Sequence, residues 1–299
     1  MSSSLVEITL VIRSVVVTLV VPFYCLVLIG VYKRRNDLNR SFVVLFIGEG
    51  VANLGVLLHQ WTFVFLPYYW EGWFRVLIDS QVMADIGMST VYLVYQAQSF
   101  SVLSIALNRY TAVVHPTRYN KIWTKGTTWA VLGIQWFIPG LYAFPPLAFE
   151  KFHGLFPPSL RVDLPVLFLY SEARSIYQTV DSSVVLGLLL PLVVFCYVRL
   201  VWVMASDVKK QSITLSADQK KEKRRVYNMS AVGLAVGCCY VVHCSLIVWL
   251  LVVIHLFHQQ PFYPYFIMKI EVVVLSGIAP LAMVIFSGGV RAEVMGLCK

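Results

Sequence analysis

The chain has 299 residues, of which 59% are hydrophobic and 13% are charged, and its formal net charge is +9. A soluble domain is typically about 45–50% apolar and about a quarter charged. So few charged residues cannot cover so much apolar chain in water, which excludes a soluble enzyme. The composition instead predicts a protein embedded in a lipid bilayer.

Seven stretches of the chain are apolar enough to cross a bilayer, for which a helix needs about 20 mostly apolar residues. The expected spans are about 14–32, 41–65, 86–110, 127–149, 179–203, 229–257 and 265–290. They are uniformly apolar and do not alternate, which is typical of helices and not of barrel strands. The sequence therefore predicts an all-α membrane protein, a seven-transmembrane helix bundle that forms a single domain over 1–299.

The basic residues are concentrated in alternate connections between these spans. Most of them fall in 33–40, 109–125 and 208–228, whereas the other side has few, among them Arg13. Because Lys and Arg in short loops mark the cytoplasmic side, this pattern predicts the N-terminus outside and the C-terminus inside. Membrane topology and attraction to anionic membrane lipids explain the positive charge, so we expect no nucleic-acid partner.

The first span is expected to be a retained signal anchor, because the opening residues 1–4 contain no basic residue and Glu7 stands where a leader would carry Lys or Arg. The six cysteines lie in spans or in the tail, so no extracellular disulfide is expected. Cys298, just beyond the last span, is a candidate for lipidation. We interpret the cysteines at 238, 239 and 244 as packing residues, and predict neither a metal site nor a cofactor.

The most specific motif is Asn108-Arg109-Tyr110, at the end of the third span, followed by Val-His-Pro and by a Tyr119 to Trp123 pair. An arginine that closes an uncharged helix usually anchors the helix at the interface, where it snorkels to water or pairs with a partner. The flanking Asn and Tyr, at the end of the third of seven spans, favour a role beyond anchoring.

This stretch resembles rhodopsin-type G protein-coupled receptors, and more closely the nematode serpentine chemoreceptors of the Srg superfamily, class V (Srv). The resemblance implies a multi-pass chemosensory receptor of the plasma membrane, in the cilia of sensory neurons, whose partner is a heterotrimeric G protein. It implies that Asn108, Arg109 and Tyr110 form the coupling and activation switch, without the acid–arginine ion pair that an acid at position 108 would allow. The positions of the amine-pairing aspartate and the retinal lysine are Val91 and Val273, which argues against both ligands.

A ligand pocket is predicted from helical phase, since Gln98 lies eleven residues before Arg109, on the same face and roughly 16 Å deeper in the membrane. The candidates for contact with a small molecule are Tyr92, Tyr95, Gln98, Asp181, His243, Lys269 and Glu271. The alternative is that these side chains hydrogen-bond between helices, or snorkel to the outer interface in the case of Asp181 and Lys269.

Glu49 is an acid inside the second span, where it costs on the order of 2.5–3.5 kcal/mol on insertion scales. We predict that Glu49, as a protonated acid beside Asn53, forms an intramembrane switch. The wider superfamily keeps an acid on this helix near this depth, which by resemblance supports the prediction.

Three other functions are weighed against the receptor. A ligand-gated cation channel subunit of the insect odorant-receptor type would have seven helices in the inverted orientation, against the basic loops. A transporter would need pseudo-repeats and coupling residues, of which the sequence has little. An enzyme would need a cluster of catalytic residues, and none is apparent.

In the receptor, the basic connection 208–228 is expected to contact the G protein, anionic membrane lipid, or both.

Overall fold

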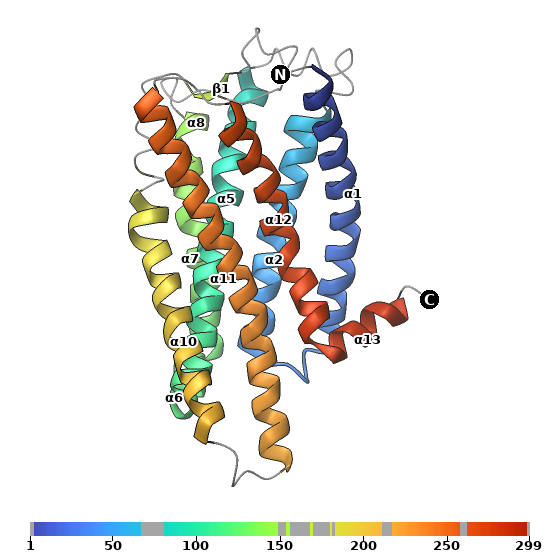
Figure 1. The fold of residues 1–299 in the computed structure, drawn as a ribbon, viewed down its shortest axis with the longest axis vertical. Coiled ribbons are helices and arrows are strands. Elements are labelled where there is room, and N and C mark those ends of the chain that lie inside the picture. The colour runs from blue at the N-terminus through green and yellow to red at the C-terminus, as the bar shows by residue number, and fades with distance from the viewer. Residues whose placement is uncertain are drawn as a thin grey trace.

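The computed structural model describes residues 3–66, 81–148, 154–155, 168–169, 180, 183–210, 217–257 and 262–297. Within this part of the chain, seven long helices run side by side along the long axis of the molecule (Figure 1). The expected all-α bundle is therefore confirmed. Asp181 and Cys298 lie outside the described residues, as do the side chains of Lys269 and Glu271.

The long helices overlap the seven expected spans. The first, third and sixth extend beyond theirs, the second and fourth end earlier, at Gln60 and Ala143, and the fifth begins later, at Leu190. They are α1 (Ser3–Lys33), α2 (Arg40–Gln60), α5 (Gln81–Val114), α7 (Lys125–Ala143), α10 (Leu190–Lys210), α11 (Ala217–Phe257) and α12 (Phe262–Phe286). The shorter elements are the π-helical turns η1 (Trp61–Phe65) and η4 (Val185–Leu189), the helices α6 (Pro116–Ile122), α8 (Pro145–Ala148) and α13 (Gly288–Leu297), and the antiparallel strands β1 (Gly154–Leu155) and β2 (Phe168–Leu169).

Local sequence explains where three helices begin. The side chain of Asn39 caps α2 by accepting a hydrogen bond from the Ser41 amide at 3.1 Å. Thr124 caps α7 in the same way through the Thr127 amide at 3.2 Å. Helix α6 begins with Pro116, whose ring presets the helical φ and whose missing N–H is not needed in a first turn. All three starts lie close together, at the end of the bundle that also carries α13 (Figure 1).

Five helices in the described part of the chain are long and apolar enough to cross a membrane, or six if α12 and α13 form one bent span. The remaining long helix, α7, is shorter, with 19 residues, and includes the polar residues Thr127, Thr128 and Gln135. Its outward face is nevertheless apolar, since Phe137 and Leu141 are 66% and 61% exposed. That face suits lipid, as expected for the fourth helix of a seven-helix bundle.

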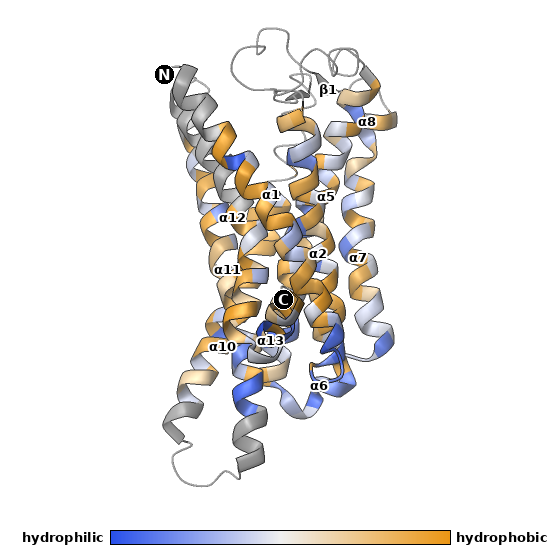
Figure 2. Ribbon diagram, turned by 90° about the vertical axis from the view of Figure 1, so that its right-hand side faces the viewer, coloured by the Kyte–Doolittle hydropathy of each residue, from blue (hydrophilic) through white to orange (hydrophobic). Residues whose placement is uncertain are grey.

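The bundle carries its apolar side chains on the outside and much of its polar chemistry on the inside. Leu19 and Val198 are among the exposed large hydrophobic residues, whereas Glu49, Gln98 and Asn108 are buried. Figure 2 shows hydrophobic residues along most of the length of the helices and hydrophilic residues gathered around α6 and near α13. This is the inverse of a water-soluble protein, and it places the bundle in lipid.

We call the end of the bundle around α6 and α13 the basic end, because many described cations lie there. They are Lys33, Arg34, Arg35, Arg40, Arg118, Lys121, Lys125, Arg224, Arg225 and Arg291. The N-terminus lies at the opposite end (Figure 1).

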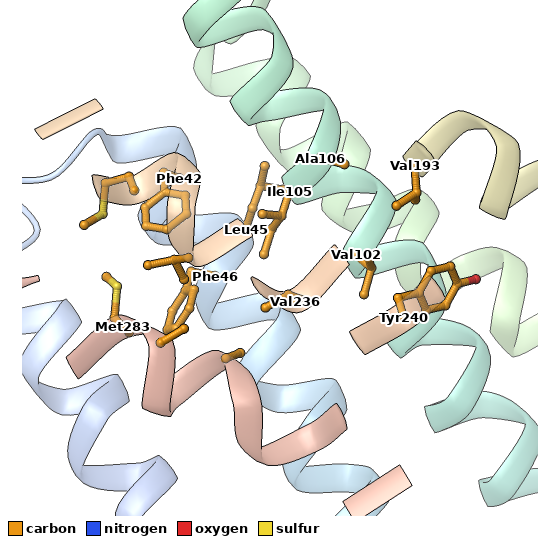
Figure 3. Packing of buried hydrophobic residues seen from close by; sticks show 14 of the residues in the cluster. Phe42, Leu45, Phe46, Val102, Ile105, Ala106, Val193, Val236, Tyr240 and Met283 are labelled. Atoms are coloured by element: carbon orange, nitrogen blue, oxygen red, sulfur yellow. The ribbon is translucent and has the colours of Figure 1, made fainter. Parts of the chain in front are cut away.

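An apolar core near the basic end holds α2, α5, α10, α11 and α12 together (Figure 3). On α2, the rings of Phe42 and Phe46 lie 5.7 Å apart and face Ile105 on α5 and Met283 on α12. These side chains are fully or almost fully buried, so a polar substitution here would leave an unpaired group in a dry environment. The core fixes the helices around the third-helix motif.

The chain turns sharply after α12, which ends at Phe286, before the end of the expected seventh span. The segments Val274–Phe286 and Gly288–Leu297 make an angle of 105°. Helix α13 therefore lies across the basic end, where the Glu293 carboxylate pairs with Arg34 at 2.9 Å. Asp37 pairs with the same guanidinium at 3.2 Å. The hydrogen bond that Arg34 donates to Asp37 and the charge of Glu293 raise the pKa of Arg34.

Candidate signalling site

Arg109 is buried at the basic end, although an arginine at a helix terminus is expected to reach toward water. Only 3% of the residue is exposed. Its guanidinium lies 4.2 Å from the centre of the Phe42 ring on α2, a cation–π distance. One of its terminal nitrogens donates a hydrogen bond to the side-chain oxygen of Asn108. In this conformation the surrounding helices separate the arginine side chain from solvent.

Asn108 connects Arg109 to two other elements of the basic end. Its oxygen accepts from Arg109, and its amide nitrogen donates to the Tyr119 hydroxyl on α6 at 3.0 Å. That hydroxyl donates in turn to the Asn39 oxygen at the start of α2, at 2.8 Å. Burial raises the pKa of the Tyr119 phenol, which keeps the hydroxyl protonated and able to donate. The amide therefore does what a carboxylate could not, because it both accepts and donates.

A second connection holds α6 and the following turn against α5. The indole nitrogen of Trp123 donates to the Thr111 hydroxyl at 2.6 Å. The backbone oxygen of Trp123 accepts from the Ser41 hydroxyl at 3.2 Å, and Thr128 on α7 donates to the same hydroxyl at 3.1 Å. Tyr119 and Trp123 of the sequence motif thus hold α6 against the last turns of α5 through hydrogen bonds with Asn108 and Thr111.

Helix α11 covers Arg109 through a glycine. A Cβ at Gly233 would lie 3.2 Å from Cγ of Arg109 and 3.0 Å from the hydroxyl oxygen of Tyr197 on α10. Both the Tyr197 hydroxyl and Nε of Arg109 are buried without a hydrogen-bond partner among the described residues. Three helices, α5, α10 and α11, therefore meet at this arginine, and a displacement of α11 would uncover it.

A cleft of about 630 Å³ adjoins this point at the basic end. It lies between the connection after α1, the first turns of α11 and the turn from α12 into α13. Arg34, Arg224 and Arg225 contribute positive charge to it. Met229 lines the cleft one helical turn before Gly233, so a movement of α11 would change both the cleft and the cover over Arg109.

A polar network lies deeper in the bundle, around the predicted switch residues. The amide nitrogen of Asn53 donates to the Tyr24 hydroxyl on α1 at 2.9 Å. Gln98 on α5 donates to the Asn53 oxygen at 2.6 Å and to the Ser276 hydroxyl on α12 at 3.1 Å. The network therefore connects four helices that are far apart in the sequence.

Glu49 lies one helical turn before Asn53 and hydrogen-bonds to its side chain. The carboxyl oxygen Oε2 is buried and has no hydrogen-bond partner among the described residues, and neither ion pair found there involves Glu49. The structure thus brings Glu49 and Asn53 together, as the sequence predicts, and adds Gln98, which the sequence places in the ligand pocket. The switch role of Glu49 and Asn53 stays a prediction.

A further cluster occupies the N-terminal end of the bundle and contains residues that the sequence analysis missed. Arg13 is buried within α1 and does not belong to an outer connection, which corrects the expectation from charge counting. Its guanidinium donates to Gln60 at 2.9 Å and lies 5.5 Å from the Phe65 ring centre. The Gln60 amide donates to the Tyr95 hydroxyl at 2.6 Å, and the rings of His59 and Tyr95 meet edge to face.

This cluster could have been found from two signals. Arg13 precedes an apolar span by one residue, and a charge so near a span is a candidate for a functional role. His59 and Gln60 end α2 just before the π-helical turn η1, and such turns are frequent at functional sites. Counting charges assigned Arg13 to an outer connection because the expected span begins at residue 14. Helix α1 begins at Ser3, so Arg13 lies within the helix.

The remaining pocket candidates are not gathered into one described cavity. Tyr92 packs edge to face against Tyr142 on α7, with ring centres 5.3 Å apart. His243 is buried on α11 beside the Tyr240 ring, at 6.3 Å. The two described cavities are lined by other residues. The ligand-contact role of these residues stays a prediction.

Comparison with known proteins gives a consistent result. The model of the family "Serpentine type 7TM GPCR chemoreceptor Srv" matches residues 13–299. Melatonin receptor type 1C of Xenopus laevis is 29% identical over 185 residues, which are 59% of this chain and 39% of the receptor. Melatonin receptor type 1A of Gallus gallus is 24% identical over 190 residues, 62% of the chain and 49% of the receptor. The chain spans about half the length of the curated relatives it matches.

Proposed function

The chain belongs to the serpentine type 7TM GPCR chemoreceptor family Srv, and from that premise we propose that it binds an extracellular small molecule and activates a cytoplasmic heterotrimeric G protein. The family consists of receptors and not of enzymes, and its membership favours a G protein-coupled receptor over the ligand-gated channel. In the proposed orientation the N-terminus is outside and the basic end faces the cytoplasm of the plasma membrane, by resemblance that of sensory cilia.

The observation that carries the proposal is the buried position of Arg109. Phe42, Asn108 and the Gly233 face of α11 surround its side chain, and the basic cleft opens one helical turn away. A bundle with two arrangements of α11 would hide this cation in one state and offer it to the G protein in the other. A ligand then acts by binding one arrangement more tightly than the other.

The ligand is proposed to enter from the N-terminal end, near Tyr92 and Tyr95. Tyr95 is connected through Gln60 to Arg13, so this region combines a buried cation with amide and phenol groups and with the aromatic rings of η1. From there the polar network of Gln98 and Asn53 leads toward the basic end along α5. Both tyrosines and Gln98 lie on that one helix, which offers a direct mechanical connection.

The decisive experiment measures nucleotide exchange on purified G protein heterotrimers in vesicles that contain the receptor. The wild-type chain is expected to accelerate exchange above receptor-free vesicles, and Arg109→Ala to abolish that acceleration. Arg118→Ala is the matched control, since Arg118 is an exposed arginine at the same end. Equal exchange with and without the Arg109 side chain would reject the proposed mechanism.

The orientation has its own test, by glycosylation mapping with acceptor sites engineered into both tails. Modification at the N-terminal site alone is expected, with the natural acceptor sequences at Asn39 and Asn228 unmodified. Both of these asparagines line the basic end of the bundle. Modification at Asn228 or at the C-terminal site would invert the bundle and remove the receptor mechanism.

A further inference from the structure

A second cavity at the basic end is separate from the cleft beside α11. It has a volume of about 190 Å³ and lies between the first turns of α2 and α7 and helix α6. It shares no lining residue with the larger cleft. Two cations, Arg40 and Lys125, line it, and no acidic residue does. Neither cation forms an ion pair within the part of the chain that the structure describes.

The chemistry of the lining suits an anion with several acceptor oxygens. Arg40 and Lys125 are exposed and supply charged donors, and the lining also contains the side-chain amide of Asn120. A guanidinium is well matched to a phosphate group, which it binds through two parallel hydrogen bonds. Because α2 and α7 both begin at this cavity, the positive ends of their dipoles add to the same potential.

The cavity continues into an apolar strip on the outer face of α7. Trp129 lines the cavity and is 54% exposed, and tryptophan is enriched at the headgroup level of membranes. Further along the same face, a Cβ at Gly133 would meet no atom within 4 Å, and the exposed rings and chains of Phe137 and Leu141 follow at intervals of one turn. An apolar strip that an acyl chain can contact thus leads from the cationic cavity along the outer face of α7.

We propose that this cavity binds the phosphorylated headgroup of an anionic phospholipid, with an acyl chain along the α7 strip of Trp129, Gly133, Phe137 and Leu141. A soluble phosphate compound would contact the two cations but not the strip, which faces the acyl chains of the bilayer. A lipid satisfies both, and basic pockets between membrane helices are a recurring site for phosphoinositide headgroups.

The site has a direct connection to the third-helix motif. Asn39 and Tyr119 line the cavity, and Tyr119 is the residue that hydrogen-bonds both Asn39 and Asn108. A bound headgroup therefore touches Tyr119 and Asn39, the residues that hydrogen-bond in series to Asn108 beside Arg109. The proposed lipid site requires only that the chain spans a bilayer. A negative result for lipid binding would therefore leave the proposed G protein coupling untouched, and the reverse also holds.

The test uses the full-length chain in phosphatidylcholine nanodiscs and a fluorescent phosphatidylinositol bisphosphate as the probe. Saturable binding is expected for the wild type, with Kd raised at least about tenfold in the double variant Arg40→Gln/Lys125→Gln. The matched control is Arg118→Gln/Lys121→Gln, which removes the same charge from exposed positions of α6 that do not line the cavity. The control is expected to change Kd less than about twofold.

Equal weakening in both double variants would reduce the effect to general attraction between basic loops and lipid, and would overturn the assignment. Unchanged binding in the lining variant would do the same. A competition arm separates lipid from soluble phosphate, with free inositol trisphosphate expected to displace the probe only weakly. If inositol trisphosphate binds as tightly as the lipid does, the site belongs to a soluble phosphate compound and the lipid proposal is wrong.

Discussion

The ring of Tyr197 on α10 lies directly against Gly237 on α11, where a Cβ would fall only 2.6 Å from the ring carbon Cδ2. One turn earlier, Gly233 makes the corresponding close approach to the Tyr197 hydroxyl and to Arg109. Two glycines in the spacing G-x-x-x-G thus let α11 close on the aromatic side chain. A larger residue at Gly237 would require the Tyr197 ring or α11 to move, whereas at Gly233 the neighbouring side chains would have to shift by a few tenths of an ångström.

Substitution Gly237→Ala is expected to push α11 away from Tyr197 and to raise basal nucleotide exchange on the G protein. Overpacking of this kind typically costs about 1–3 kcal/mol, so thermal stability in detergent should fall as well. Gly140→Ala on α7 is the matched control, because a Cβ at that position meets no atom within 4 Å. The idea fails if Gly237→Ala behaves as Gly140→Ala does in both measurements.

Replacement Asn108→Asp is expected to lower basal exchange, because a carboxylate would pair with Arg109 more strongly than the amide does. The substitution turns a hydrogen bond from a guanidinium to a neutral amide into an ion pair, at the loss of the donation to Tyr119, so we expect a decrease of about threefold to tenfold. Asn108→Ala should have the opposite effect, since it frees Arg109 and Tyr119 at once. Asn36→Asp, at an exposed position in the connection after α1 that lines neither cavity, provides the same charge change as a control. A rise in basal exchange with Asn108→Asp would contradict this account.

The variant Glu49→Gln tests the intramembrane switch. Glutamine preserves the size and the hydrogen bond toward Asn53 but removes the ability to ionise. We expect receptor amounts in the membrane to stay within about twofold and G protein activation to change at least about fivefold, a difference of about 1 kcal/mol. Glu293→Gln, at the half-buried ion pair with Arg34, is the comparison. Unchanged activation in Glu49→Gln would remove this acid from the mechanism.

The variant Tyr95→Phe tests the cluster at the N-terminal end. It removes the acceptor of the Gln60 amide, and a buried donor without a partner costs about 1–3 kcal/mol. A lower melting temperature is expected, together with a changed orientation of Gln60 toward Arg13 and a weaker response to an activating compound. Tyr32→Phe, whose ring stacks with Arg35 at the basic end and is exposed, should be neutral. Equal melting temperatures for Tyr95→Phe and the wild type would argue against a structural role of this hydrogen bond.

The sequence by itself determined the class of protein and the approximate place of each membrane helix. Crossing a bilayer is a local property, since about 20 apolar residues suffice whatever the neighbouring helices do. The sequence also identified Arg109 through its position in the third span, and Glu49 and Asn53 through their depth in the second span. The pairing of Glu49 with Asn53 follows from one helical turn and needs no tertiary information.

Only the tertiary structure decided how these residues are surrounded. Helical periodicity does not say how each helix is rotated, or which faces meet, so the sequence could not show that α11 covers Arg109 at Gly233. It could not show that Gln98 bonds to Ser276, 178 residues away, or that Arg13 reaches Gln60 inside the bundle. Charge counting put Arg13 at the outer surface because it treats every cation near a span as solvated. Packing instead buries this cation, where an amide and an aromatic ring replace the water that it loses.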